Sequence, residues 1–246
     1  MRILDIDMDF FLDGIAHWQT GDDRLNDEDF KPWKEEEFIR FLEDKCLLSK
    51  DNPIKGRIIK EHNEAFLFWD ELIKENCLQK PFHITHIDAH SDTGLGDSGY
   101  KYIMGELMLH PIEKRREHLK LDKVWMGNYL SYAMACGWVS DINFVVPEFW
   151  DNEMIRCHLK NFSDDSTAFQ FKGFKNIDIV MSYERILTGG ITPDTIDDEI
   201  SFKIIRNKEY QEKENFDYII FCQSPSYTPK KADYMLEVIK PYIIEI

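Results

Sequence analysis

The stretch Phe82-His-Ile-Thr-His-Ile-Asp-Ala-His-Ser-Asp92 begins as an alternating, β-branched run and ends in three polar residues. Side chains two residues apart on a strand point to the same face, so Asp88, His90 and Asp92 converge where this strand ends. Two carboxylates and an imidazole at one strand end are unfavourable together unless a cation lies between them. The stretch therefore predicts a divalent metal at the end of a strand.

A second acidic run opens the chain. Ile3-Leu-Asp-Ile-Asp-Met-Asp-Phe-Phe11 alternates apolar and acidic residues with period two, which predicts a strand with Asp5, Asp7 and Asp9 on one face. Like charges along one face destabilise a strand without a counter-ion, so these residues are also candidate metal ligands. Which two of these three aspartates bind the metal stays open. We favour Asp7 and Asp9, because they are nearer the end of the predicted strand.

A histidine precedes the strand that carries the first motif. Residues 60–77 show helical spacing of apolar side chains, and His62 shares their inward face at the start of the predicted helix. A lone inward histidine is more often a core residue than a ligand. His62 becomes a candidate ligand here because the next strand is the one that ends in Asp88.

Short apolar strands alternate with helices along the chain, which is typical of an α/β domain with a mostly parallel sheet. We expect further strands at residues 124–126, 141–146, 176–181, 202–205 and 216–221, with the 202–205 strand at a sheet edge. We expect helices at residues 34–48, 60–77, 129–136, 149–159 and 230–242. Residues 1–246 contain no repeat or long linker and are predicted to form one domain. Sites in parallel sheets lie at the carboxyl ends of the strands.

Charge and cysteine content narrow the class of protein. The chain has 30 basic and 46 acidic residues, a net charge of −16, which argues against nucleic acid or an anionic membrane as a partner. No apolar run is long enough to span a membrane. The five cysteines show no metal-type spacing, and the first residues resemble no targeting peptide, so we expect a cytoplasmic protein with reduced thiols.

Asp88-Ala-His-Ser-Asp92 is similar to the Asp-Ala-His-x-Asp motif of the arginase/deacetylase (ureohydrolase) superfamily. In those enzymes the motif's first Asp bridges two manganese ions, an Asp-x-Asp strand adds further ligands, and a His at a helix start completes the set. The resemblance implies a three-layer α/β/α arginase-like fold with rearranged connectivity, because the Asp-x-Asp strand comes first here. It also implies two Mn²⁺ ions, with ligands drawn from His62, Asp88, His90, Asp92, Asp7, Asp9 and Asp5.

Further motifs resemble one branch, the peptide arginases of the OspR type: Glu61-His-Asn-Glu64, the Gly127-Asn128 turn and Ser224-Pro-Ser-Tyr-Thr-Pro229. That branch hydrolyses arginine side chains of a ribosomally made precursor peptide to ornithine and urea, which makes an arginine-containing peptide the expected partner. By the same resemblance Asp92, Asp9 and His90 are the expected catalytic residues. Ordinary arginases carry a guanidinium-binding Glu where this chain reads Gln223-Ser224-Pro225, so the substrate anchor must differ. Candidate substrate-binding residues are Asn128, Glu106, Glu184 and Ser224.

Three other interpretations remain. A deacetylase of the same superfamily would use one zinc ion at Asp88 and His90. A catalytically silent metal-binding or interaction module would keep the site for stability alone. A dehalogenase-type phosphatase also begins with an Asp-x-Asp strand, but that interpretation leaves Asp88-Ala-His-Ser-Asp92 unexplained.

Overall fold

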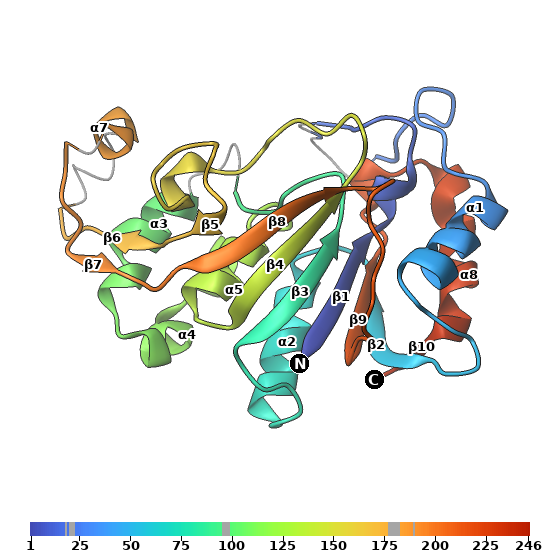
Figure 1. The fold of residues 1–246 in the computed structure, drawn as a ribbon, viewed down its shortest axis with the longest axis horizontal. Helices are drawn as coiled ribbons and strands as arrows, with labels where there is room; N and C mark the ends of the chain where they lie inside the picture. Colours follow the sequence, from blue (N-terminus) through green and yellow to red (C-terminus); the bar gives the residue numbers. More distant parts are fainter. Residues whose placement is uncertain (18, 20–22, 95–98, 177–182, 189) are drawn as a thin grey trace.

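A mostly parallel, eight-stranded sheet organises the protein. The computed structural model describes residues 1–17, 19, 23–94, 99–176, 183–188 and 190–246. Within them the strand order is β10-β2-β9-β1-β3-β4-β8-β5, and only β5 runs antiparallel to its neighbour (Figure 1). The strands are β1 (Arg2–Asp7), β2 (Ile54–Ile59), β3 (Phe82–Ile87), β4 (Val139–Val146), β5 (Ala168–Phe169), β8 (Ile200–Arg206), β9 (Tyr218–Cys222) and β10 (Ile243–Glu245). A separate pair joins β6 (Lys172–Gly173) to β7 (Thr195–Ile196).

The first strand of the chain lies in the middle of the sheet. β1 pairs in parallel with β3 on one side, where Ile3 faces Ile84, and with β9 on the other, where Ile3 faces Tyr218. All five residues of β9 are buried, as expected for a strand covered on both faces. Because β1, β3, β4 and β9 are parallel, their carboxyl ends meet at one edge of the sheet.

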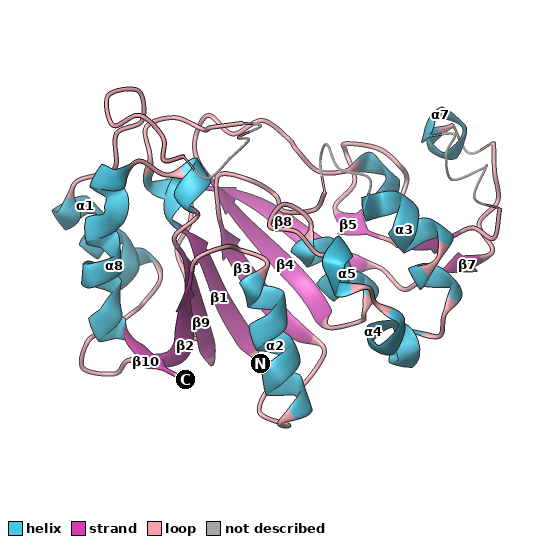
Figure 2. Ribbon diagram, turned by 180° about the vertical axis from the view of Figure 1, so that it is seen from behind, coloured by secondary structure: helices cyan, strands magenta, loops and turns pink. Residues whose placement is uncertain are grey.

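Helices cover both faces of the sheet. α2 (Glu64–Lys74) and α5 (Tyr129–Ala135) lie across one face, where Phe66 and Trp69 share a core with Ile84 (Figure 2). α1 (Glu35–Arg40) and α8 (Tyr234–Ile239) contribute to the core on the opposite face, where Phe38 and Met235 pack among strand residues. Within the described ranges, no helix is long and apolar enough to cross a membrane.

The remaining helical segments are short. α3 (Gly99–Gly105), α4 (Arg115–His118) and α7 (Tyr183–Leu187) lie toward the β5 end of the molecule (Figure 1). A π-helical turn, η2 (Phe41–Lys45), continues α1. The 3-10 turns are η1 (Met8–Phe11), η3 (Leu107–Leu109), η4 (Ile112–Lys114), η5 (Leu121–Lys123), η6 (Arg156–His158), η7 (Pro225–Tyr227), η8 (Lys230–Asp233) and η9 (Lys240–Tyr242).

The predicted α/β class and mostly parallel sheet are confirmed, and several predicted element bounds are wrong. The acidic strand ends at Asp7, because Asp7 Oδ1 accepts a hydrogen bond from the Asp9 backbone and starts η1. Residues 124–126 contain no strand, and the helical part of residues 149–159 is limited to η6. The 202–205 strand lies within β8, which has neighbours on both sides. Strands β2 and β10 were not predicted, and most of the predicted 176–181 strand falls outside the described residues.

Candidate metal centre

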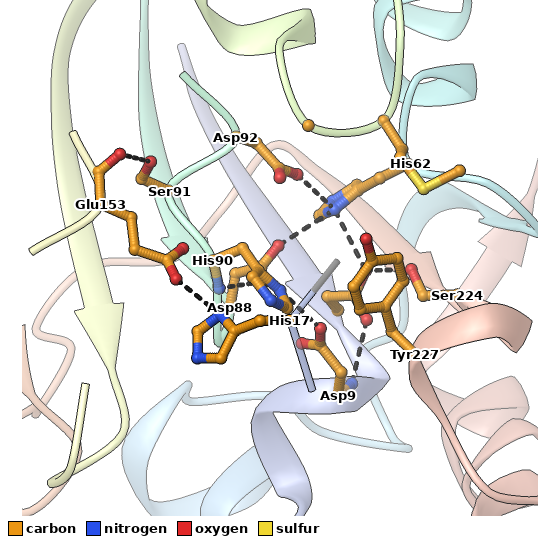
Figure 3. A pocket seen from close by; sticks show the side chains of 13 residues that line it. Asp9, His17, His62, Asp88, His90, Ser91, Asp92, Glu153, Ser224 and Tyr227 are labelled. Atoms are coloured by element: carbon orange, nitrogen blue, oxygen red, sulfur yellow. Dashed lines mark hydrogen bonds and ion pairs between the residues drawn. The ribbon is translucent and has the colours of Figure 1, made fainter. Parts of the chain in front are cut away.

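A pocket of about 100 Å³ opens at the carboxyl edge of the sheet (Figure 3). Its acidic wall comes from the end of β1 and from the loop after β3. His62 enters from the turn before α2, and two further loops follow β9 and β4. The lining side chains are Asp7, Asp9, His17, His62, Asp88, His90, Ser91, Asp92, Met126, Gly127, Glu153, Ser224 and Tyr227.

His62 faces three carboxylates at ion-pair distance. Its Nδ1 lies 3.2 Å from Asp7 Oδ2, 3.1 Å from Asp88 Oδ2 and 3.0 Å from Asp92 Oδ2. This nitrogen is buried and has no hydrogen-bond partner. A buried polar atom without a partner is costly, whereas a cation among one imidazole nitrogen and three carboxylate oxygens would satisfy all four. We call this set position A.

His90 and the other oxygen of Asp88 define a second position. His90 Nδ1 lies 2.9 Å from Asp9 Oδ2 and 3.6 Å from Asp88 Oδ1. These three side chains form position B, and their ligand atoms are close enough to share an ion. Asp88 therefore directs one oxygen to each position, which is the arrangement a bridging carboxylate needs.

The charges of this cluster also favour cations. Burial and the charge of Asp88 raise the pKa of Asp92 to about 6. Burial, Asp7 and Asp88 together raise the pKa of Asp9 well above its usual range. Burial opposes the ionisation of Asp88, but interactions with the imidazoles of His62 and His90 outweigh it and hold its pKa below the usual range. These carboxylates cannot all be ionised at low cost unless positive charge is added.

The donor atoms fit a hard or borderline divalent ion. Carboxylate oxygens and imidazole nitrogens suit Mn²⁺ and similar ions, and thiolates would be needed for a soft-metal site. Cys222 lies near His62 and Asp7, but burial raises the pKa of its thiol well above the usual range. For a hard or borderline ion the oxygen and nitrogen atoms are the better donors.

Asp5 lies outside the pocket, behind His62. Its carboxylate pairs with His62 Nε2 at 3.0 Å and with His86 Nδ1 at 3.2 Å, and it accepts a hydrogen bond from the Tyr129 hydroxyl. Asp5, His62, His86 and Tyr129 are all buried. Of the three acids in the N-terminal run, Asp7 and Asp9 line the pocket and Asp5 does not.

Sequence reasoning missed Glu153, which follows β4 and lines the pocket beside His90. Its Oε1 lies 3.0 Å from Nδ1 of His17, whose side chain is 46% exposed at the mouth. Burial raises the pKa of Glu153, and nearby His90 and His17 oppose that rise. The local sequence, Trp150-Asp-Asn-Glu-Met-Ile155, contains two acids and gives no signal that singles out Glu153.

The structure places the four residues that were predicted to bind substrate in different surroundings. Ser224 lines the pocket in a left-handed conformation (φ 43°), and its Oγ donates a hydrogen bond to Asp7 Oδ2. Glu106 lies outside the pocket lining and pairs with Lys120 at the surface, 2.8 Å away. Glu184 lies exposed in α7, away from the pocket lining. The Asn128 side chain hydrogen-bonds to the backbone of the loop before α5: it accepts from Trp125 N and donates to Lys123 O.

Comparison with known proteins adds no relative. Neither a scan against protein-family models nor a search of curated proteins finds a match to this chain.

Proposed function

We propose that this protein is a manganese-dependent peptide arginase, a binuclear hydrolase that converts arginine side chains of a peptide to ornithine and urea. The observation that carries the proposal is the partnerless Nδ1 of His62 facing three carboxylates, with Asp88 shared between positions A and B. The donor set fits two divalent ions, with His62, Asp7, Asp88 and Asp92 as ligands at A and His90, Asp9 and Asp88 at B. Such a pair lowers the pKa of water and supplies a nucleophile near neutral pH.

The substrate is inferred from the charge of the pocket. Glu153 is an acid in the lining that belongs to neither metal position, so it is available for a cationic side chain. A guanidinium can bind a carboxylate through two parallel hydrogen bonds. The pocket lining, as described, contains neither Lys nor Arg. The α-carboxylate of free arginine would find no Lys or Arg there and would face several acids, whereas an arginine within a peptide lacks that charge.

The protein's own groups then have distinct tasks. Glu153 orients the guanidinium, and the buried walls limit access of bulk water. Hydrolysis breaks the bond between the guanidinium carbon and the side-chain nitrogen, and water supplies the oxygen of urea and the protons of the amine. Asp92 or Asp9 holds the proton taken from water and returns it to the leaving amine. His17, half exposed beside Glu153, lies between the pocket and solvent.

The proposal is tested by incubating the metal-loaded protein with an arginine-containing peptide. Mass spectrometry should show a loss of about 42 mass units per modified arginine, with one urea released for each. Free arginine should be a much poorer substrate than the same residue with both ends blocked. Asp88→Asn should abolish urea release and lower bound manganese while the domain stays folded, as judged by circular dichroism.

Each rival interpretation predicts a different result. Deacetylation of an acetyl-lysine peptide without urea production would favour the zinc deacetylase. Metal-dependent thermal stability without turnover of either peptide would favour a catalytically silent module. Full urea release from a variant whose metal content has fallen to background would refute the metal mechanism.

A further inference from the structure

The two metal positions differ in what lies behind their histidines. His62 and His90 both direct Nδ1 toward carboxylates of the cluster. Behind His62, Nε2 lies 3.0 Å from Asp5 Oδ1. Behind His90, Nε2 lies 2.9 Å from the backbone oxygen of Ala16. One histidine is therefore supported by an acid and the other by a neutral carbonyl.

Asp5 is held as a charged acceptor. It is completely buried, and both of its oxygens receive hydrogen bonds, one from His62 and the other from His86 and the Tyr129 hydroxyl. An ionised carboxylate only accepts hydrogen bonds, so His62 Nε2 carries a proton, and Nδ1 is the nitrogen that could bind a cation at position A. A carboxylate behind a ligating histidine fixes its tautomer and makes its free nitrogen more basic.

Position A is also more enclosed and richer in donors. Its four side chains are at most 8% exposed, whereas the His90 side chain at position B is 19% exposed. Position A has three carboxylates around its histidine, and position B has two. Both differences, like the support from Asp5, favour tighter metal binding at position A than at position B.

We propose that the two positions bind metal unequally: position A retains its ion when position B has lost it, and Asp5 sets much of this difference as a positioning residue. This inference rests on the metal centre proposed above and is independent of the substrate. In practice, a protein purified without added metal would keep one ion at A and would need free metal to fill B.

The test is a Mn²⁺ titration of the metal-free protein by calorimetry, with bound ions counted by elemental analysis. The wild type should show one tight and one weak site. Asp5→Asn keeps the shape but removes the charge, and should weaken the tight site about 10–100-fold while leaving the weak one unchanged. Asp141→Asn is the matched control, because Asp141 also pairs with a histidine, His83, outside the pocket. It should titrate like the wild type.

Two further variants assign the sites without relying on Asp5. His90→Ala should keep one ion at the tight affinity of the wild type, and His62→Ala should keep only the weak site. Two equal sites in the wild type, or an Asp5→Asn variant that weakens both sites equally, would overturn the inference and leave the binuclear centre standing. A wild type that binds no manganese would overturn the proposed function as well.

Discussion

Replacing Glu153 with Gln tests whether this residue anchors a cationic substrate. The change keeps the size of the side chain and removes its negative charge. A hydrogen bond to a charged group contributes about 1.5–3 kcal/mol. Because the Glu153 side chain is only 11% exposed, salt screens its charge weakly. At about 1.4 kcal/mol per factor of ten, kcat/KM for an arginine peptide should fall roughly 10- to 150-fold.

The assay is urea release at subsaturating peptide, with manganese content measured on the same sample. The anchor role predicts an unchanged metal content, and the measurement is needed because Glu153, His17 and His90 could together also hold a cation. Glu148→Gln is the control: Glu148 is in the same loop after β4, but it pairs with Lys208 away from the pocket lining. If Glu153→Gln keeps its metal and its kcat/KM stays within about twofold of the wild type, Glu153 is not the anchor.

Three further predictions concern stability. Chelation of metal should lower the melting temperature, since an ion held at 100 times its Kd stabilises the fold by about 2.7 kcal/mol per site; an unchanged melting curve would contradict the metal centre. Gly56→Ala should destabilise the protein by about 1–3 kcal/mol in urea unfolding, because the added Cβ would lie 2.0 Å from the Ile219 oxygen. Gly14→Ala, where the nearest atom is 3.6 Å away, should change little, and equal effects would refute the steric reasoning. Burial opposes ionisation of Asp70, but Arg116 outweighs it and lowers the pKa, so Asp70→Asn should cost about 1 kcal/mol at pH 7. That loss should shrink as the pH falls below about 4, where the acid is protonated in the unfolded chain; a pH-independent loss would contradict it.

The sequence predicted the parts of the fold that depend on side-chain periodicity. The run from Phe82 to Ile87 alternates as a strand should, and its motif continues into the loop at the end of β3. Periodicity predicted the wrong strand end where a side chain hydrogen-bonds to the backbone. The acidic alternation continues past Asp7, but the carboxylate of Asp7 turns the chain into η1 and carries Asp9 out of the strand.

Strand β2 was missed because its sequence carries opposing signals. Gly56 and the charged residues Lys55 and Arg57 disfavour a strand locally. In the structure Gly56 permits close contact with β9, so the glycine that argues against a strand is what fits it into the sheet.

The cluster of candidate metal ligands was predictable from the sequence, and Glu153 was not. Asp88, His90 and Asp92 are close in sequence, so their spacing alone brings them together. Glu153 reaches the pocket from an irregular loop after β4, and no short motif surrounds it. The sequence did offer Glu106 as a candidate substrate-binding residue, but in the structure Glu106 pairs with Lys120.

The central place of β1 has a consequence for how the protein folds during synthesis. Domains generally fold as units during synthesis, from the N-terminus onward, and distant strand pairs form late. The proposed ligands of positions A and B all lie between Asp7 and Asp92, whereas β9, which pairs with the other side of β1, is made much later. In the proposed metal centre, metal binding to these ligands would couple to folding. Ions bound early would then cross-link β1 to the β3 loop while that side of the sheet is still open, so we expect metal supply during expression to affect the yield of folded protein.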